Sequence, residues 1–504
     1  MKRFVLTLLV ILSPFAFHLS PVWAYDNPVL PYDFSNPDVI RLGKYYYMTY
    51  SSFASTPGLQ ILRSEDGVHW NYVDAALKDT VPGYGHLDAC PAGSGVWAPS
   101  LRFHDGRFYL YYGDPDIGIY CIRSAPKTVK IPCQWEQAVL VKRGKGLIDP
   151  CPVWDVKGRC YLVHAFAGSR AGFESALAVC ELSSDGLSVI HEDELVFDGH
   201  PYNPMVKGPK FYKRNSYYYI FCPAGDVETG WQLCLRSKSP YGPYEVHRVL
   251  EQDTTDMNGP YQGAWVNNWF YHSQDAGAAG RIVHLEPLKW HSGWPVIGDK
   301  GRPVKTAKDE GAPFKGIGVE PVVHEEFASR PLAPEWQWSG NRSALYYYLN
   351  PDSSRLRLFT YPADSVEIAP NLLLRKIYAH TAFIFEARVR FVPNRENQLH
   401  EEAGLIIQGQ QTKTLPILND GQWWYARIVM DKKQVCHFYL STDGHTWALV
   451  DDGFQAEAGE QVGTRIGFYA TRDRKRFHDA GYLDIDYVDI TPAPLTHYTL
   501  IPEP

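Results

Sequence analysis

The chain has 504 residues, more than one hydrophobic core usually holds, which predicts at least two domains. Charged residues make up 21% of it, the formal net charge is -7 and no basic run occurs, so composition argues against a nucleic-acid partner. Aromatic residues make up 14%, a content that suits β structure and the stacking of flat rings on sugar faces.

The first residues have the pattern of a targeting segment. Lys2 and Arg3 precede an apolar run over residues 4–17, and a small-residue site, VWA, follows at its end. This order predicts a signal peptide over residues 1–24 and export to the periplasm or the outside of the cell. A membrane anchor is the alternative, but Pro14 interrupts the run, so we expect no membrane span.

One pattern then repeats five times. Each copy opens with a polar or aromatic residue near Gly or Pro, followed by an apolar strand, a tight polar turn and a second strand rich in Tyr and Phe. The copies cover residues 36–52, 97–113, 149–165, 207–224 and 262–275. Their period of roughly fifty to sixty residues is in the range of propeller blades. The sequence therefore predicts an all-β fold that begins with a five-bladed β-propeller over residues 25–300.

The residue that opens each copy has a predicted place. In a propeller the innermost strand of each blade starts near the central axis, so these five side chains are expected to point into one axial pocket. They are Asn36, Trp97, Asp149, Lys207 and Gln262.

A second region follows the repeats. Residues 301–322 are rich in Gly, Pro and charge and are typical of a linker. Residues 323–492 contain alternating strands joined by turns such as TDGH at 442–445, a pattern that predicts a β-sandwich. Its role, sugar binding or packing against the propeller, is open at this stage.

The nine cysteines are an odd number, and several lie inside strand-like runs. They are interpreted as small buried hydrophobic residues more than as a disulfide framework. No CxxC pair occurs, so the sequence gives no support for a structural zinc site.

Five motifs carry a resemblance to a known family. They are NPDVIRLGKYYYMTYSSF (36–53), GVWAPSLRFHDGRFYLYYGDPDIGIY (95–120), GKGLIDPCPVWDVKGRCYLVHAFAGSRAG (144–172), KGPKFYKRNSYYYIFCPAG (207–225) and NGPYQGAWV (258–266). Together they resemble glycoside hydrolase family 43, the five-bladed propeller β-xylosidases and α-L-arabinofuranosidases. Residues 323–491 resemble the concanavalin-like sandwich that many of these enzymes carry. The resemblance implies a protein that acts on or binds oligosaccharide or polysaccharide fragments of the arabinose and xylose type. We expect it to be a monomer.

The same resemblance assigns roles in the pocket. The family inverts stereochemistry with a general acid and a general base, while a third carboxylate raises the pKa of the acid. Asp149 stands at the pKa-modulating position, but Asn36 stands at the position of the base and Lys207 at that of the acid. Tyr261 replaces a histidine that helps to bind an axial metal ion in the family, so we expect no metal and no cofactor.

These replacements predict weak or absent hydrolysis by the family's mechanism. An amide does not accept a proton from water, and a lysine beside Asp149 stays charged, because an opposite charge favours the ionised form. Two hypotheses remain open: an active glycosidase with relocated carboxylates, or a non-catalytic carbohydrate-binding protein. The candidates for substitute acids are Asp38, Asp226 and Glu228.

Other residues are candidates for substrate binding. They are Trp97, Gln262, Arg281, Phe53 and Trp231. Trp97 could stack on a sugar or belong to a blade core, and Arg281 could bind hydroxyl groups or form a structural ion pair. We also expect Lys207 to contact Asp149, directly or through one water, since a buried lysine needs a partner. Alternatively, its charge is available to an acidic sugar such as a uronate.

Overall fold

The computed structural model describes residues 23–85, 93–309, 322–394, 400–475 and 478–493. The predicted signal peptide lies outside these ranges up to residue 22, and its last two positions fall in strand β1 (Trp23–Asp26). No helix in the described ranges is long and apolar enough to span a membrane. The eight described cysteines form no disulfide, and all but Cys133 are buried, as expected of small hydrophobic residues.

The predicted five-bladed propeller is confirmed, with each blade a sheet of four consecutive antiparallel strands. Blades one and two contain β2 (Asp38–Leu42), β3 (Tyr45–Thr49), β4 (Gly58–Ser64), β5 (Asn71–Leu77), β6 (Trp97–His104), β7 (Arg107–Asp114), β8 (Gly118–Arg123) and β9 (Val139–Arg143). Blade three contains β10 (Leu147–Trp154), β11 (Cys160–Phe166), β12 (Ala176–Leu182) and β13 (Val189–Asp198). Blades four and five contain β14 (Lys210–Arg214), β15 (Tyr217–Ala224), β16 (Trp231–Ser237), β17 (Glu245–Glu251), β18 (Tyr261–Val266), β19 (Trp269–Asp275), β20 (Arg281–His291) and β21 (Trp294–Ile297).

The β-sandwich is also confirmed and consists of two packed sheets. The larger sheet contains β23 (Val323–Glu325), β25 (Tyr347–Asn350), β26 (Arg355–Phe359), β29 (Phe383–Val392), β32 (Trp424–Met430), β33 (Val435–Ser441), β34 (Ala448–Gln455) and β36 (Tyr482–Pro492). The smaller contains β24 (Gln337–Trp338), β27 (Tyr361–Ala363), β28 (Leu373–Lys376), β30 (Glu401–Gln408), β31 (Thr412–Pro416) and β35 (Arg465–Asp473). The predicted linker is not wholly irregular, because β22 (Thr306–Asp309) pairs with β1.

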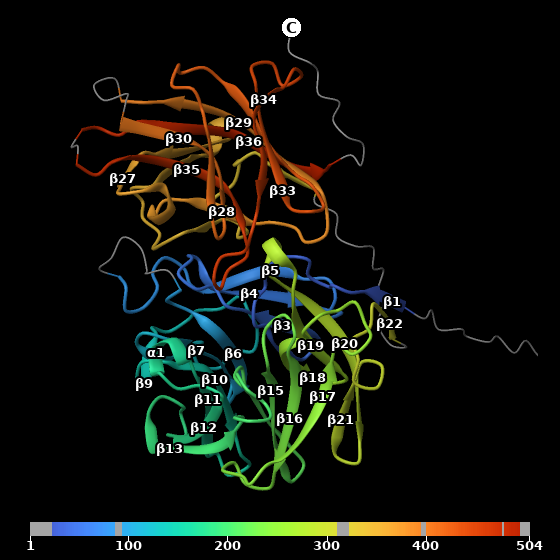
Figure 1. The fold of residues 1–504 in the computed structure, drawn as a ribbon. Helices are drawn as coiled ribbons and strands as arrows, with labels where there is room; N and C mark the ends of the chain where they lie inside the picture. The colour runs from blue at the N-terminus through green and yellow to red at the C-terminus, as the bar shows by residue number, and fades with distance from the viewer. Residues whose placement is uncertain (1–22, 86–92, 310–321, 395–399, 476–477, 494–504) are drawn as a thin grey trace, which may run out of the picture.

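The sandwich sits on one end of the propeller (Figure 1). Its core continues into blade five, where Ala278, Ala279 and Ile282 pack with residues of both sandwich sheets. Backbone hydrogen bonds also join Thr56 of the propeller to Trp338 of the sandwich, at 2.7 and 3.1 Å. The two domains therefore share buried apolar surface as well as backbone hydrogen bonds, which ties the sandwich to blades one and five.

The inner strands of all five blades begin at or just after the same kind of backbone turn. A residue with positive φ precedes a proline at Asn36 (61°), Ala98 (37°), Asp149 (58°), Gly208 (59°) and Gly259 (34°). Asn, Asp and Gly adopt this left-handed conformation more readily than other residues. By this geometry Ala98 and Gly208 are the residues equivalent to Asn36 and Asp149, and Trp97 and Lys207 stand one position before them. The five residues that open the repeats therefore do not all occupy equivalent positions, which corrects the prediction.

A buried charge cluster lies two residues further along these strands. Asp38 is 0% exposed, and its Oδ2 accepts hydrogen bonds from Arg102 Nη1 and the Leu101 amide, both at 2.6 Å. The Lys210 ammonium is 3.8 Å from Asp38 Oδ1 and donates to Ser100 Oγ at 2.9 Å. Asp38 is therefore the anionic centre of a structural cluster, and its proposed role as a substitute acid is wrong.

Replacing Asp38 with Asn tests the cluster. The variant leaves Arg102 and Lys210 buried without a compensating charge, so we expect the free energy of unfolding to fall by about 3–5 kcal/mol. Chemical unfolding measures this change. Asp226→Asn is the control, because Asp226 is exposed and its loss should change stability by less than about 0.5 kcal/mol. Equal unfolding midpoints for the two variants would contradict the structural role of Asp38.

Candidate functional site

Asn36 is held at both ends of its side-chain amide. Its Oδ1 accepts a hydrogen bond from Arg281 Nη1 at 2.9 Å, and its Nδ2 donates to Gln262 Oε1. Three residues from opposite ends of the propeller sequence thus meet at the axis, because blade five closes the ring against blade one. The amide orientation satisfies a guanidinium donor on one side and a carbonyl acceptor on the other.

Asp149 lies in the same pocket and is 4% exposed. Its Oδ2 accepts a hydrogen bond from the Gly208 amide at 2.7 Å. Burial raises the pKa of Asp149 above its usual value, although the Gly208 N–H and the charge of Lys207 act in the opposite direction. The carboxyl group therefore holds a proton more readily than an exposed aspartate does.

Gly208 is required by two features of its position. Its φ is +59°, and a Cβ atom there would lie 2.6 Å from Cδ of Gln262. Because Gln262 is buried and bonded to Asn36, it cannot move away without breaking that hydrogen bond. Because Gly208 has no side chain, Asp149 and Gln262 can both pack against its backbone.

Lys207 is partly buried beside Tyr261, with its Nζ 5.9 Å from the centre of the phenol ring. Burial lowers the pKa of Lys207, but Tyr261 and Asp149 together raise it further, so it lies above its usual value. The side chain is a cation at neutral pH. The expected contact with Asp149 is not direct, because within the described ranges no carboxylate oxygen lies within 4.0 Å of this ammonium, and a contact through one water stays a prediction.

The axial metal of the resembled family does not fit this pocket. Tyr261 supplies a phenol in place of an imidazole and is 1% exposed. The neighbouring Lys207 ammonium already places a positive charge against its ring. A cation at this point would be repelled by that charge.

The predicted aromatic residues have different environments. Phe53 and Trp97 are edge to face with ring centres 6.3 Å apart, and Trp97 Nε1 donates to the Gly93 carbonyl at 3.0 Å. The Arg248 guanidinium lies 4.1 Å from the ring centre of Trp231 and covers one of its faces. Trp97 is therefore held rigidly and partly open, whereas Trp231 has at most one face for a ligand.

The remaining substitute acids do not lie at the pocket floor. Asp226 and Glu228 are exposed in the loop after β15, where the Glu228 amide donates to Asp226 Oδ1 at 3.4 Å. Asp275, which the sequence analysis did not select, is partly buried and is the cross-strand partner of Arg281. Burial raises its pKa, while Arg281 lowers it and Asp226 raises it. The sequence signal that could have indicated Asp275 was its position six residues before Arg281, at the other end of the short turn that joins β19 to β20.

The sandwich also contributes to this site. Gln461 Oε1 accepts a hydrogen bond from Arg281 Nη2 at 3.4 Å, and Asp33 Oδ2 accepts one from the Gly463 amide at 2.9 Å. A cleft of about 410 Å³ lies between this loop and Phe53. The loop between β34 and β35 thus contacts Arg281 through Gln461, which the sequence alone did not predict.

Comparisons with known proteins agree with this architecture. A family model described as glycosyl hydrolases family 43 matches residues 25–295, and one described as a beta xylosidase C-terminal concanavalin A-like domain matches residues 324–420. A Xylanibacter ruminicola protein named "Putative beta-xylosidase" is 34% identical over 479 residues, covering 89% of this chain and 86% of its own. A non-reducing end alpha-L-arabinofuranosidase from Bacteroides ovatus is 28% identical, over 81% of this chain and 78% of its own.

Solved structures show the same fold. A family 43 protein from Bacillus licheniformis superposes with a TM-score of 0.78 at 21% identity, covering 93% of this chain and all of its own. A family 43 protein from a Bacteroides ovatus xyloglucan locus gives the same TM-score at 22% identity and the same coverage. Both the propeller and the sandwich are therefore shared with these structures.

Replacing Gly208 with Ala tests the packing of the pocket. The variant meets both an unfavourable φ and the Gln262 side chain, so we expect a loss of stability larger than about 1 kcal/mol. Gly43→Ala is the matched control, because Gly43 has a φ of +61° with nothing within 4 Å of a Cβ. Thermal unfolding compares the two, and an equal shift in both variants would show that Gln262 is not packed tightly against Gly208.

Proposed function

We propose, from the premise that the chain belongs to glycosyl hydrolases family 43, that it binds plant-polysaccharide fragments containing xylose or arabinose and hydrolyses them weakly or not at all. We further propose that residues 1–24 direct its export and that it acts as a monomer. The relatives named as xylosidases and an arabinofuranosidase support this choice of sugars.

The observation that carries the proposal is the environment of Asn36. An inverting hydrolase needs a base that takes a proton from water on the face of the sugar opposite the leaving group. The Asn36 amide is not basic, and its oxygen is already occupied by Arg281. Water near this group can be hydrogen-bonded but is not deprotonated there. General-base catalysis typically contributes 10²–10⁴-fold, roughly, to the rate, and this contribution is lost.

Lys207 supports the same conclusion from the position of the acid. A general acid must release its proton to the leaving oxygen at working pH. The pKa of Lys207 lies above its usual value, so the proton is held too firmly for efficient transfer at neutral pH. The charge of Lys207 also opposes the positive charge that develops on the sugar in the transition state.

The groups that bind sugar remain in the pocket. Arg281 and Gln262 present polar atoms beside Asn36, and Trp97 presents a rigid, partly open ring. Such a combination of a few fixed polar groups and an aromatic surface is typical of sites that bind sugars. Binding of a neutral sugar thus depends on residues other than Asn36 and Lys207.

A second candidate function is slow hydrolysis that uses Asp275 as the acid. Its partly buried carboxyl group, with a pKa raised by burial, lies beside Arg281. Asp275→Asn separates the two functions, since it should leave a binding protein unchanged and should remove any residual turnover that depends on this carboxyl group.

Restoring both replaced groups tests the proposal. The native chain should bind xylo- or arabino-oligosaccharides in calorimetry and release product at least about 10⁴-fold more slowly than an ordinary turnover of 1–10³ s⁻¹. Asn36→Asp combined with Lys207→Glu should raise product release, and either change alone should raise it much less, because the two groups act together. Ordinary turnover by the native chain would contradict the proposal.

The charge of Lys207 predicts a preference among ligands. Since no carboxylate pairs with it within the described parts of the chain, a uronate group can do so. Lys207→Met should weaken binding of a glucuronate-bearing xylo-oligosaccharide at least about tenfold and leave the neutral xylo-oligosaccharide nearly unaffected.

The control for this ligand preference is Lys213→Met, which removes a lysine that also lies over a tyrosine ring, 3.6 Å from the centre of Tyr218, but outside the pocket. It should change neither affinity. A lower melting temperature for Lys207→Met with unchanged affinity for both sugars would show that the lysine is only structural.

A further inference from the structure

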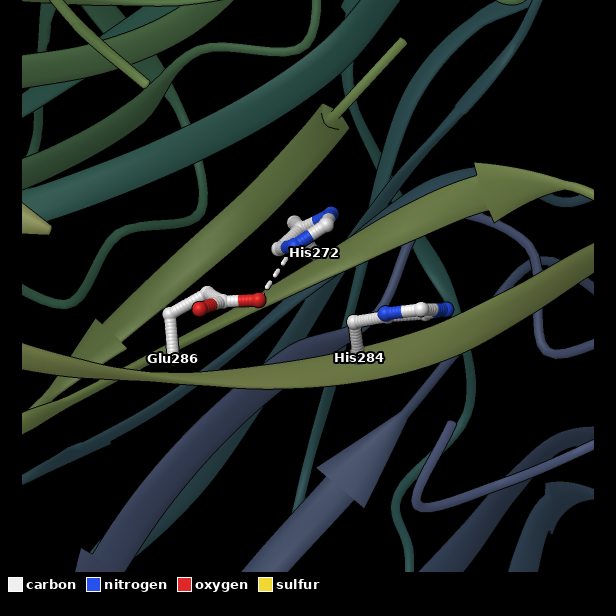
Figure 2. Close-up of side chains that lie close together, drawn as sticks. All are labelled: His272, His284 and Glu286. Atoms are coloured by element: carbon white, nitrogen blue, oxygen red, sulfur yellow. Dashed lines mark hydrogen bonds and ion pairs between the residues drawn. The ribbon is translucent and has the colours of Figure 1, made fainter. Parts of the chain in front are cut away.

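Three metal-ligating side chains gather in blade five. His272 on β19 and His284 on β20 are direct cross-strand partners, so their side chains lie on the same face of the sheet. Glu286 is two residues after His284 and shares that face. Figure 2 shows the two imidazoles and the carboxylate side by side between the strands.

The three groups are close together and shielded from solvent. The exposed fractions are 0% for His272, 2% for His284 and 0% for Glu286. His272 Nε2 lies 3.3 Å from Glu286 Oε1, and one ligand atom from each residue lies within 4.8 Å of the other two. A divalent ion is small enough to reach all three with modest side-chain rotation.

Among the described residues, the buried His284 ring has no hydrogen-bond partner. Neither ring nitrogen makes a hydrogen bond within the described residues. Buried polar groups in proteins are nearly always paired, so two unpaired nitrogens on one ring require an explanation.

We propose that His272, His284 and Glu286 bind one divalent transition-metal ion of the zinc type. Two imidazole nitrogens and one carboxylate oxygen suit this class of ion, whereas calcium and magnesium prefer oxygen ligands alone. Ligand atoms about 2.0–2.2 Å from a tetrahedral zinc ion stand about 3.3–3.5 Å from one another, close to the spacing of His272 and Glu286. His284 would move by no more than about 1.5 Å to complete the set.

The surrounding groups already orient the ligands. The Val304 amide donates to Glu286 Oε2 at 3.0 Å, which leaves Oε1 facing His272. His272 Nδ1 lies 3.1 Å from the Ser273 carbonyl, which directs Nε2 toward the other two residues. Such outer contacts fix the tautomer and the direction of metal ligands. The ion would join β19 and β20 to the segment around Val304, and its role is structural and independent of the proposed sugar binding.

Blade three contains a similar histidine–carboxylate pair, His164 and Asp193, in which the hydrogen bonds and the charge are satisfied by the protein. His164 is also buried, and its Nε2 lies 3.0 Å from Asp193 Oδ1. There the Lys142 ammonium lies 3.3 Å from the other Asp193 oxygen and supplies the positive charge. In blade five a second histidine lies near the carboxylate, and no lysine among the described residues supplies a positive charge to Glu286. A metal cation would supply that charge.

Metal analysis of the full chain, produced without a polyhistidine tag, tests the proposal. We expect about one equivalent of zinc after gel filtration, and a melting temperature that falls on chelation and returns when zinc is added. His284→Gln should reduce bound zinc at least tenfold and abolish the zinc-dependent shift. His164→Gln is the matched control and should keep both.

A cobalt titration of the chelated native chain makes the test independent of variant folding. Cobalt should give visible absorption bands that saturate near one equivalent and disappear when zinc displaces it. The proposal is overturned if the native chain retains no zinc and shows neither the bands nor a shift in melting temperature. Equal loss of zinc in both variants would also overturn it.

Discussion

The buried charge cluster of Asp38, Arg102 and Lys210 is the interaction on which the pocket depends. It joins the inner strands of blades one, two and four at the axis. Burying a charge without a partner is strongly unfavourable, so each strand is fixed where its charge is compensated. Because Asn36 and Gly208 stand two residues before Asp38 and Lys210, fixing the cluster also fixes the pocket.

In the proposed function, the pocket binds a sugar without transferring protons. The family resemblance assigns the base to the position of Asn36, whose amide is satisfied at both ends by Arg281 and Gln262. It assigns the acid to the position of Lys207, which stays charged. Arg281 is in turn joined to Gln461 of the sandwich. In our proposal, these contacts hold a sugar in one orientation, and Lys207 favours a sugar that carries negative charge.

The fold could be predicted from the sequence because its signals are local. Strand alternation, hairpin turns and a repeat of about fifty to sixty residues specify blades without knowledge of distant contacts. The repeat also placed Asn36 and Asp149 near the axis. What it could not give were features decided by packing: the burial of Asp38, the pairing of Asp149 with the Gly208 amide instead of Lys207, and the approach of Gln461 from another domain.

The metal cluster was missed for the same reason. A search for CxxC spacing overlooks ligands on paired strands, where His272 meets His284 only through the register of β19 and β20. A His-x-Glu sequence on one strand, with a second histidine on its neighbour, is the signal that could have been used.

A crystal structure of the native chain soaked for days with a xylo-oligosaccharide tests most directly the claim that hydrolysis is weak or absent. We predict an intact glycosidic bond beside Asn36 and Lys207, whereas a cleaved product at that place would contradict the claim.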